Sequence, residues 1–81
     1  RRAKRIFAEA ERWRDRITAG GDEDVRSFCA LSGASAPPLG ELLGNIRNAP
    51  NERIEKTLRR QLFRAIHDAL MAAAQDDRIS R

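Results

Sequence analysis

The chain has 81 residues, which is enough for one domain and too few for two. Apolar residues make up 41% of it and charged residues 35%, and no apolar run approaches the roughly 18 residues of a transmembrane helix. This composition excludes a disordered chain and a membrane-spanning one. Lys and Arg total 16 against 12 Asp and Glu, so nucleic acid remains a candidate partner of this basic chain. Cys29 is the only cysteine, so we expect a reducing, cytoplasmic location.

The first two predicted helices cover residues 2–19 and 22–32. The first has apolar residues at helical spacing on one face, at Ile6, Ala10, Trp13 and Ile17. A pair of glycines, Gly20 and Gly21, ends it. The second begins with acidic residues that suit the positive end of a helix dipole, and it ends at Gly33.

The third and fourth predicted helices cover residues 36–47 and 51–76. In the third, prolines occupy the first turn, where no intrahelical N–H donor is needed, and Gly40 and Gly44 share one face that another backbone can approach closely. The fourth is about 37 Å long, which is longer than the others. We therefore expect its apolar face to extend beyond the core and to bind a second copy or another protein. The residues of this partner face are Ile54, Leu58, Leu62, Phe63, Ile66, Leu70 and Ala73.

These elements predict an all-α fold, a small bundle of four helices forming a single domain over residues 1–81. The chain starts at Arg1 rather than Met, which is compatible with a fragment of a longer protein. We expect the first and last helices to enclose the short central pair between them.

The stretch FCALSGAS, residues 28–35, predicts a helix-turn-helix-like corner. A small residue, Cys29, allows a close crossing, and Gly33 four positions later tolerates positive φ in the turn. Apolar residues that lock such a pair are present at Phe28, Ala34, Leu39 and Leu42. Ser32 departs from the pattern, because a larger apolar residue is commoner before the glycine. A plain corner between two packed helices would match as well.

Residues 8–58 resemble the helix-turn-helix region of ParB-type partition proteins and a related module in phage and recombinase-associated proteins. The matching pieces are Arg12-Trp13, DVRSFCALSGAS and Ala49-Pro50. The resemblance implies a DNA-binding module of a bacterial regulator, partition protein or mobile-element protein, whose third helix enters the major groove.

The candidate DNA contacts follow from the usual geometry of such a unit. Outward positions of the third helix are mostly alanine, proline and glycine, so few side chains there can read base edges. We therefore expect phosphate contacts to supply most of the affinity. The candidate residues are Ser35 and Glu41 at base edges, Asn45, Arg47 and Asn48 at the far end of the helix, and Arg26, Arg1, Arg2, Lys4 and Arg5 at phosphates.

The alternative function is a helical protein–protein interaction or oligomerisation domain, as a subunit or docking segment of a larger complex. Gly40, Gly44 and the alanine-rich end of the last helix would then be close-packing surfaces. Catalysis is not expected, because the sequence has no phosphate-binding loop and no nucleophile beside a base. One histidine and one cysteine do not make a usual zinc site, so we expect no metal and no cofactor.

Overall fold

The structure is a computed structural model that describes residues 2–76, with only the backbone of Arg2. It contains four helices, α1 (Arg2–Gly20), α2 (Asp22–Ser32), α3 (Ala36–Arg47) and α4 (Glu52–Gln75). The predicted all-α bundle is confirmed, and each predicted helix boundary agrees to within one residue. The sequence also predicts a frayed tail over residues 76–81, of which residues 77–81 lie outside the described residues.

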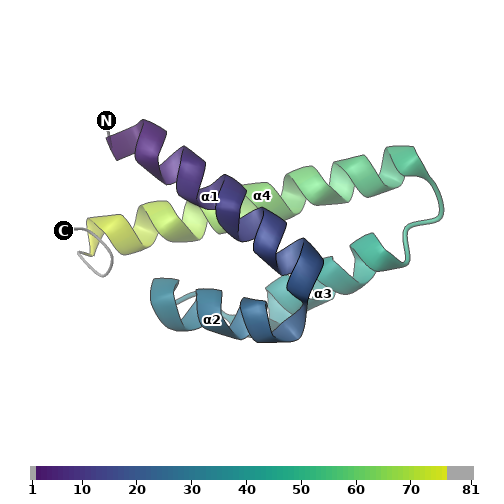
Figure 1. The fold of residues 1–81 in the computed structure, drawn as a ribbon, viewed down its shortest axis with the longest axis horizontal. Helices are drawn as coiled ribbons and strands as arrows, with labels where there is room; N and C mark the ends of the chain where they lie inside the picture. The colour runs from purple at the N-terminus through teal and green to yellow at the C-terminus, as the bar shows by residue number, and fades with distance from the viewer. Residues whose placement is uncertain (1, 77–81) are drawn as a thin grey trace.

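The arrangement of the helices differs from the prediction in one respect. The long helices α1 and α4 cross in direct contact, with the rings of Phe7 and Phe63 5.1 Å apart, and α2 and α3 lie together on one side of them (Figure 1). The expectation that α1 and α4 enclose the central pair is therefore wrong. The reason is that α1 and α4 each have an apolar stripe long enough to reach the other as well as the short helices.

The ends of the helices follow from local residues. Gly21 and Gly33 adopt φ of 96° and 82°, which disfavours other residues, and each separates two helices. Asn51 caps α4, because its side-chain oxygen accepts a hydrogen bond of 3.0 Å from the Ile54 N–H. Ser35 occupies the N-cap position of α3 by its backbone, but its hydroxyl makes no capping bond.

The core is assembled on one stripe of α4, which packs against all three other helices. Each helix contributes at least one large, fully buried side chain: Ile17, Phe28, Leu43, Leu62, Ile66 and Leu70. Phe28 is the largest of them, and the ring of Trp13 packs on it with a centroid distance of 5.3 Å. This contact ties the corner between α2 and α3 to α1, and both short helices also pack on α4.

We expect Phe28→Ala to lower the free energy of unfolding by about 3–5 kcal/mol, because it leaves a cavity in a small core. Urea denaturation followed by circular dichroism measures this change. Leu31→Ala is the matched control, because Leu31 lies on the same helix and is 42% exposed, so its loss is expected to cost about 0.5 kcal/mol or less. Equal effects of the two substitutions would contradict this account of the core.

Candidate nucleic-acid interface

The turn between α2 and α3 is built on Gly33, as the sequence predicts. The N–H of Gly33, in its left-handed conformation, donates a 2.8 Å hydrogen bond to the Cys29 carbonyl. Ser32, which departs from the sequence pattern, is buried with its hydroxyl satisfied. It donates to the Phe28 carbonyl at 2.9 Å and accepts from the Ala34 N–H at 3.2 Å. A polar residue is tolerated at this position because it stabilises the turn itself.

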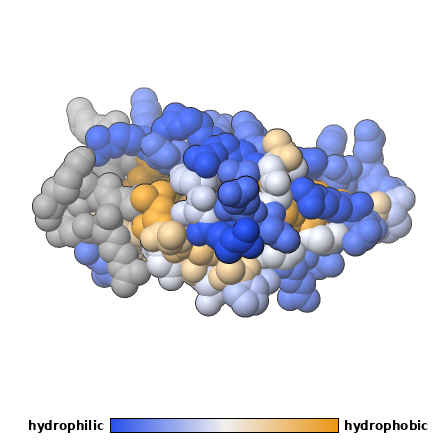
Figure 2. Space-filling model, turned by 60° about the horizontal axis from the view of Figure 1, so that its bottom comes forward, coloured by the Kyte–Doolittle hydropathy of each residue, from blue (hydrophilic) through white to orange (hydrophobic). Residues whose placement is uncertain are grey.

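The outward face of α3 is uncovered. Leu39, Leu43 and Ile46 are buried, whereas the opposite side of the helix is open to solvent. A Cβ atom added at Gly40 or Gly44 would have no neighbour within 4 Å. Figure 2 brings this side of the molecule forward and shows white and orange surface interrupting the hydrophilic blue. At Gly40 and Gly44, therefore, the face presents backbone rather than side-chain donors.

The candidate DNA contacts of α3 are only partly gathered on this face. Ser35, Glu41 and Asn45 are exposed along it. Asn48 is exposed too, but its side-chain amide donates a 3.0 Å hydrogen bond to the Gly44 carbonyl and so terminates α3. The guanidinium of Arg47 turns toward the α1–α2 junction, where it would lie 3.3 Å from a Cβ at Gly21. In that position it complements the carbonyl end of α1.

The basic candidates outside α3 do not join them. Arg26 is exposed on α2 and forms no ion pair with a described residue. Lys4 and Arg5 are exposed at the N-terminal end of α1, which lies next to α4 and away from α3 (Figure 1). Arg1 lies outside the described residues, and the side chain of Arg2 does too. Phosphate contacts from α3 and from the N-terminal cluster to one short stretch of duplex are therefore disfavoured.

The charge of the corner also disfavours a polyanion there. Between Asp22 and Arg47, acidic residues number four and basic residues two, so α2 and α3 together carry net negative charge. Asp24 is engaged by Arg16 of α1 at 3.2 Å, but the remaining carboxylates are exposed. The positive charge of the chain must lie on the long helices.

A row of basic residues on α4, missed by the sequence analysis, forms a continuous positive surface. The row consists of Arg53, Lys56, Arg60 and Arg64, and we refer to it as the basic stripe. All four side chains are exposed, and none forms an ion pair with a described residue. The spacing i, i+3, i+7 and i+11 places them on one helix face over about 16 Å.

The ion pairs that the sequence permits on α4 differ from those that the structure forms. The sequence offers two i,i+4 pairs, Glu52 with Lys56 and Glu55 with Arg59. The structure forms only the second, with a distance of 3.0 Å, and leaves Lys56 unpaired. The signal that reveals the stripe is the absence of carboxylates from its face between Arg53 and Arg64.

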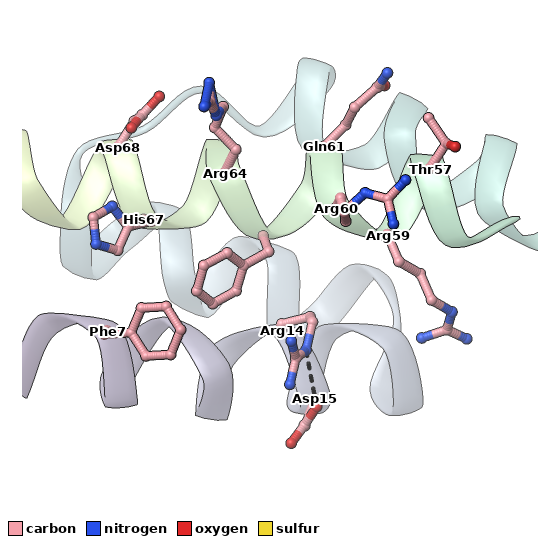
Figure 3. Close-up of a pocket in the computed structure, with 11 residues that line it drawn as sticks. Phe7, Arg14, Asp15, Thr57, Arg59, Arg60, Gln61, Arg64, His67 and Asp68 are labelled. Carbon is pink, nitrogen blue, oxygen red and sulfur yellow. Dashed lines mark hydrogen bonds and ion pairs between the residues drawn. The ribbon is translucent and has the colours of Figure 1, made fainter. Parts of the chain in front are cut away.

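An open groove of about 1140 Å³ between α1 and α4 borders the basic stripe. Its floor consists of the rings of Phe7, Phe63 and His67, and Arg14 lies over Phe63 at 5.5 Å (Figure 3). Phe7 is 49% exposed, which is more than any other large apolar side chain of the described residues. His67 is half-buried and stacks on Phe63, with ring centroids 5.9 Å apart.

The predicted partner face on α4 is wrong for four of its residues. Leu62, Ile66, Leu70 and Ala73 are at most 1% exposed within the single chain, so no partner can contact them while the bundle is folded. They are covered because α1 and α3 pack on different parts of α4. The other three remain accessible at least in part, with Ile54 37% exposed and Leu58 and Phe63 half-buried.

Other kinds of site find little support in residues 2–76. Burial raises the pKa of the Cys29 thiol, so its nucleophilic thiolate form is disfavoured. No group of three or more His, Cys, Asp or Glu side chains in this range is placed to hold a metal ion. None of the helices in the same range has both the length and the apolar character needed to cross a membrane.

Comparison of the chain with protein-family models, with curated proteins and with solved structures finds no match. The resemblance to the partition-protein module therefore stays a prediction.

Substitution of Gly40 or Gly44 by alanine tests whether the outward face of α3 is open. We expect Gly40→Ala and Gly44→Ala each to raise the free energy of unfolding by about 0.5–1 kcal/mol, since both sites are helical and open. Thermal unfolding measures the gain, and Gly33→Ala is the control, with a loss expected from its positive φ. Destabilisation by Gly40→Ala or Gly44→Ala would show that the α3 face is covered.

Proposed function

We propose that this domain binds DNA mainly through phosphate contacts and with little reading of base edges. The observation that carries the proposal is the basic stripe of α4, with four exposed cations on one helix face and no carboxylate partner. Unpaired cations in a row favour a polyanion over a compact acidic ligand, because a row matches a chain of phosphates.

The corner between α2 and α3 supports the same function in a secondary way. Its open outward face would admit the close approach of a nucleic-acid backbone, and Ser35 and Arg26 are free to donate hydrogen bonds to phosphates. Docking of α3 alone is disfavoured by the net negative charge of the corner and by Glu41, which would repel phosphates. We therefore assign the larger share of the binding free energy to α4.

A specific observation favours a second candidate, a protein-interaction domain. Gly40 and Gly44 leave open space along one side of α3, and Leu31 of α2 is 42% exposed. Small residues allow the backbone of another helix to approach closely. A protein partner on this side would leave the basic stripe free, so the two candidates occupy different surfaces. A homodimer is a third possibility, and Ile54 is the most exposed large apolar residue on α4 for it.

Fluorescence anisotropy with a labelled random DNA duplex, titrated from about 50 to 200 mM salt, tests the proposal. Neutralisation of four phosphates by the basic stripe predicts a slope of log K against log salt of about −3.5. The double substitution Arg60→Gln/Arg64→Gln is expected to reduce the magnitude of that slope by about 2. Arg26→Gln is the matched control, because Arg26 is also exposed and unpaired but lies on α2.

The two variants assign the outcome to a surface. Loss of binding in Arg60→Gln/Arg64→Gln with binding retained in Arg26→Gln supports the basic stripe. The reverse pattern places the duplex at the corner instead. No salt-dependent binding by the native chain at low salt would overturn DNA binding and leave the protein-interaction candidate.

A further inference from the structure

We propose that the groove between α1 and α4 binds single-stranded nucleic acid, with an unpaired base stacked on the ring of Phe7 and phosphates held by Arg60 and Arg64. This inference rests on the proposed function, because it takes nucleic acid as the partner. It goes further by naming the form that is bound and the residues that distinguish it from a duplex.

The aromatic floor of the groove provides the stacking surface. Phe7 meets Phe63 edge to face at 5.1 Å and His67 at 6.3 Å, so its ring is held in place from α4 while remaining 49% exposed. The ring is already held in one position and its remaining surface is open. A base can therefore stack on it without the cost of ordering the side chain. Stacking of this kind tolerates any base, because every base has a π-face.

Cations flank that floor at positions suited to a backbone. Arg60 and Arg64 lie one turn apart on α4, line the groove, and form no ion pair with a described residue. Arg14 is already engaged, since its guanidinium donates to Asp15 at 3.1 Å and lies over the Phe63 ring. In Figure 3 the aromatic rings lie between the two helices, with Arg64 on the opposite side of α4 from α1. A strand that crosses α4 would meet the cations and the rings in succession.

The composition of the groove disfavours the other occupants. An amphipathic peptide helix needs a row of apolar pockets, but Phe7 and Phe63 are the only apolar side chains that line this groove. A second copy would bring one basic stripe against another, which like-charge repulsion disfavours. A duplex keeps its bases stacked inside, so it can use the arginines but not Phe7. Only an unpaired strand uses both features.

The test compares a labelled oligothymidine and a labelled oligouridine of about 15 nucleotides with a DNA duplex, all by anisotropy with the full chain. Phe7→Ala is expected to weaken binding of the single strands about fivefold or more and to leave duplex binding unchanged. Phe7→Tyr, which keeps the stacking ring, is expected to restore the affinity. Leu31→Ala is the control for removal of an exposed apolar side chain, and circular dichroism confirms folding of each variant.

The outcomes separate this inference from the proposed function. Unchanged single-strand affinity in Phe7→Ala overturns the inference, while salt-dependent duplex binding would still support the proposed function. Single-strand binding that depends on Phe7, in a chain that does not bind duplex, supports the inference and removes duplex DNA as the target. Tighter binding of an acidic helical peptide than of either oligonucleotide would assign the groove to a protein partner and overturn the inference. A difference between the oligothymidine and oligouridine arms shows which nucleic acid the groove prefers.

Discussion

Burial of one face of α4 is the constraint on which the rest of the molecule depends. Leu62, Ile66 and Leu70 lie on that face, and the other three helices pack on it. In a helix with 3.6 residues per turn, residues two positions apart lie about 200° apart. Arg60 and Arg64 each precede a buried residue by two positions and must point away from the core. The same periodicity that forms the core therefore forms the basic stripe.

The helix-turn-helix corner of α2 and α3 that the sequence predicts and the basic stripe of α4 are two separate surfaces. The corner between α2 and α3 has a left-handed glycine in its turn, but its net charge is negative, and Arg47 is directed to the end of α1. On α4, by contrast, four exposed cations share one helix face from which Glu55 points away. A fold element does not fix a function, because function depends on the chemistry of the surface presented. Here the electrostatics favour α4 over α3 as the phosphate-binding helix.

Much of the fold was predictable because local signals determine it. The apolar spacing of α1 and α4 marked the helices, and Gly33 marked the corner. The packing of α1 on α4 was not predictable from these signals, since periodicity gives a face and not its neighbour. The partner face was wrong for the same reason, because helix length alone does not show which neighbours cover Leu62 or Leu70.

The candidate site was less predictable than the fold. The sequence interpretation followed the pattern of known recognition helices to α3 and did not consider the cations of α4 as a group. The exposure of Phe7 depends on how α1 crosses α4, and no local pattern contains that information. Lys56 is unpaired because the ion pair with Glu52 that the sequence permits does not form in the structure. The i, i+3, i+7, i+11 spacing of the stripe was present in the sequence and could have been found there.

The most direct test of the central claim is an amide chemical-shift titration of the ¹⁵N-labelled chain with nucleic acid. This account predicts that the largest shifts fall between Arg53 and Arg64 of α4, with smaller ones in α3. Shifts concentrated between Gly33 and Asn45, with α4 unchanged, would contradict it and would place the nucleic acid at the corner.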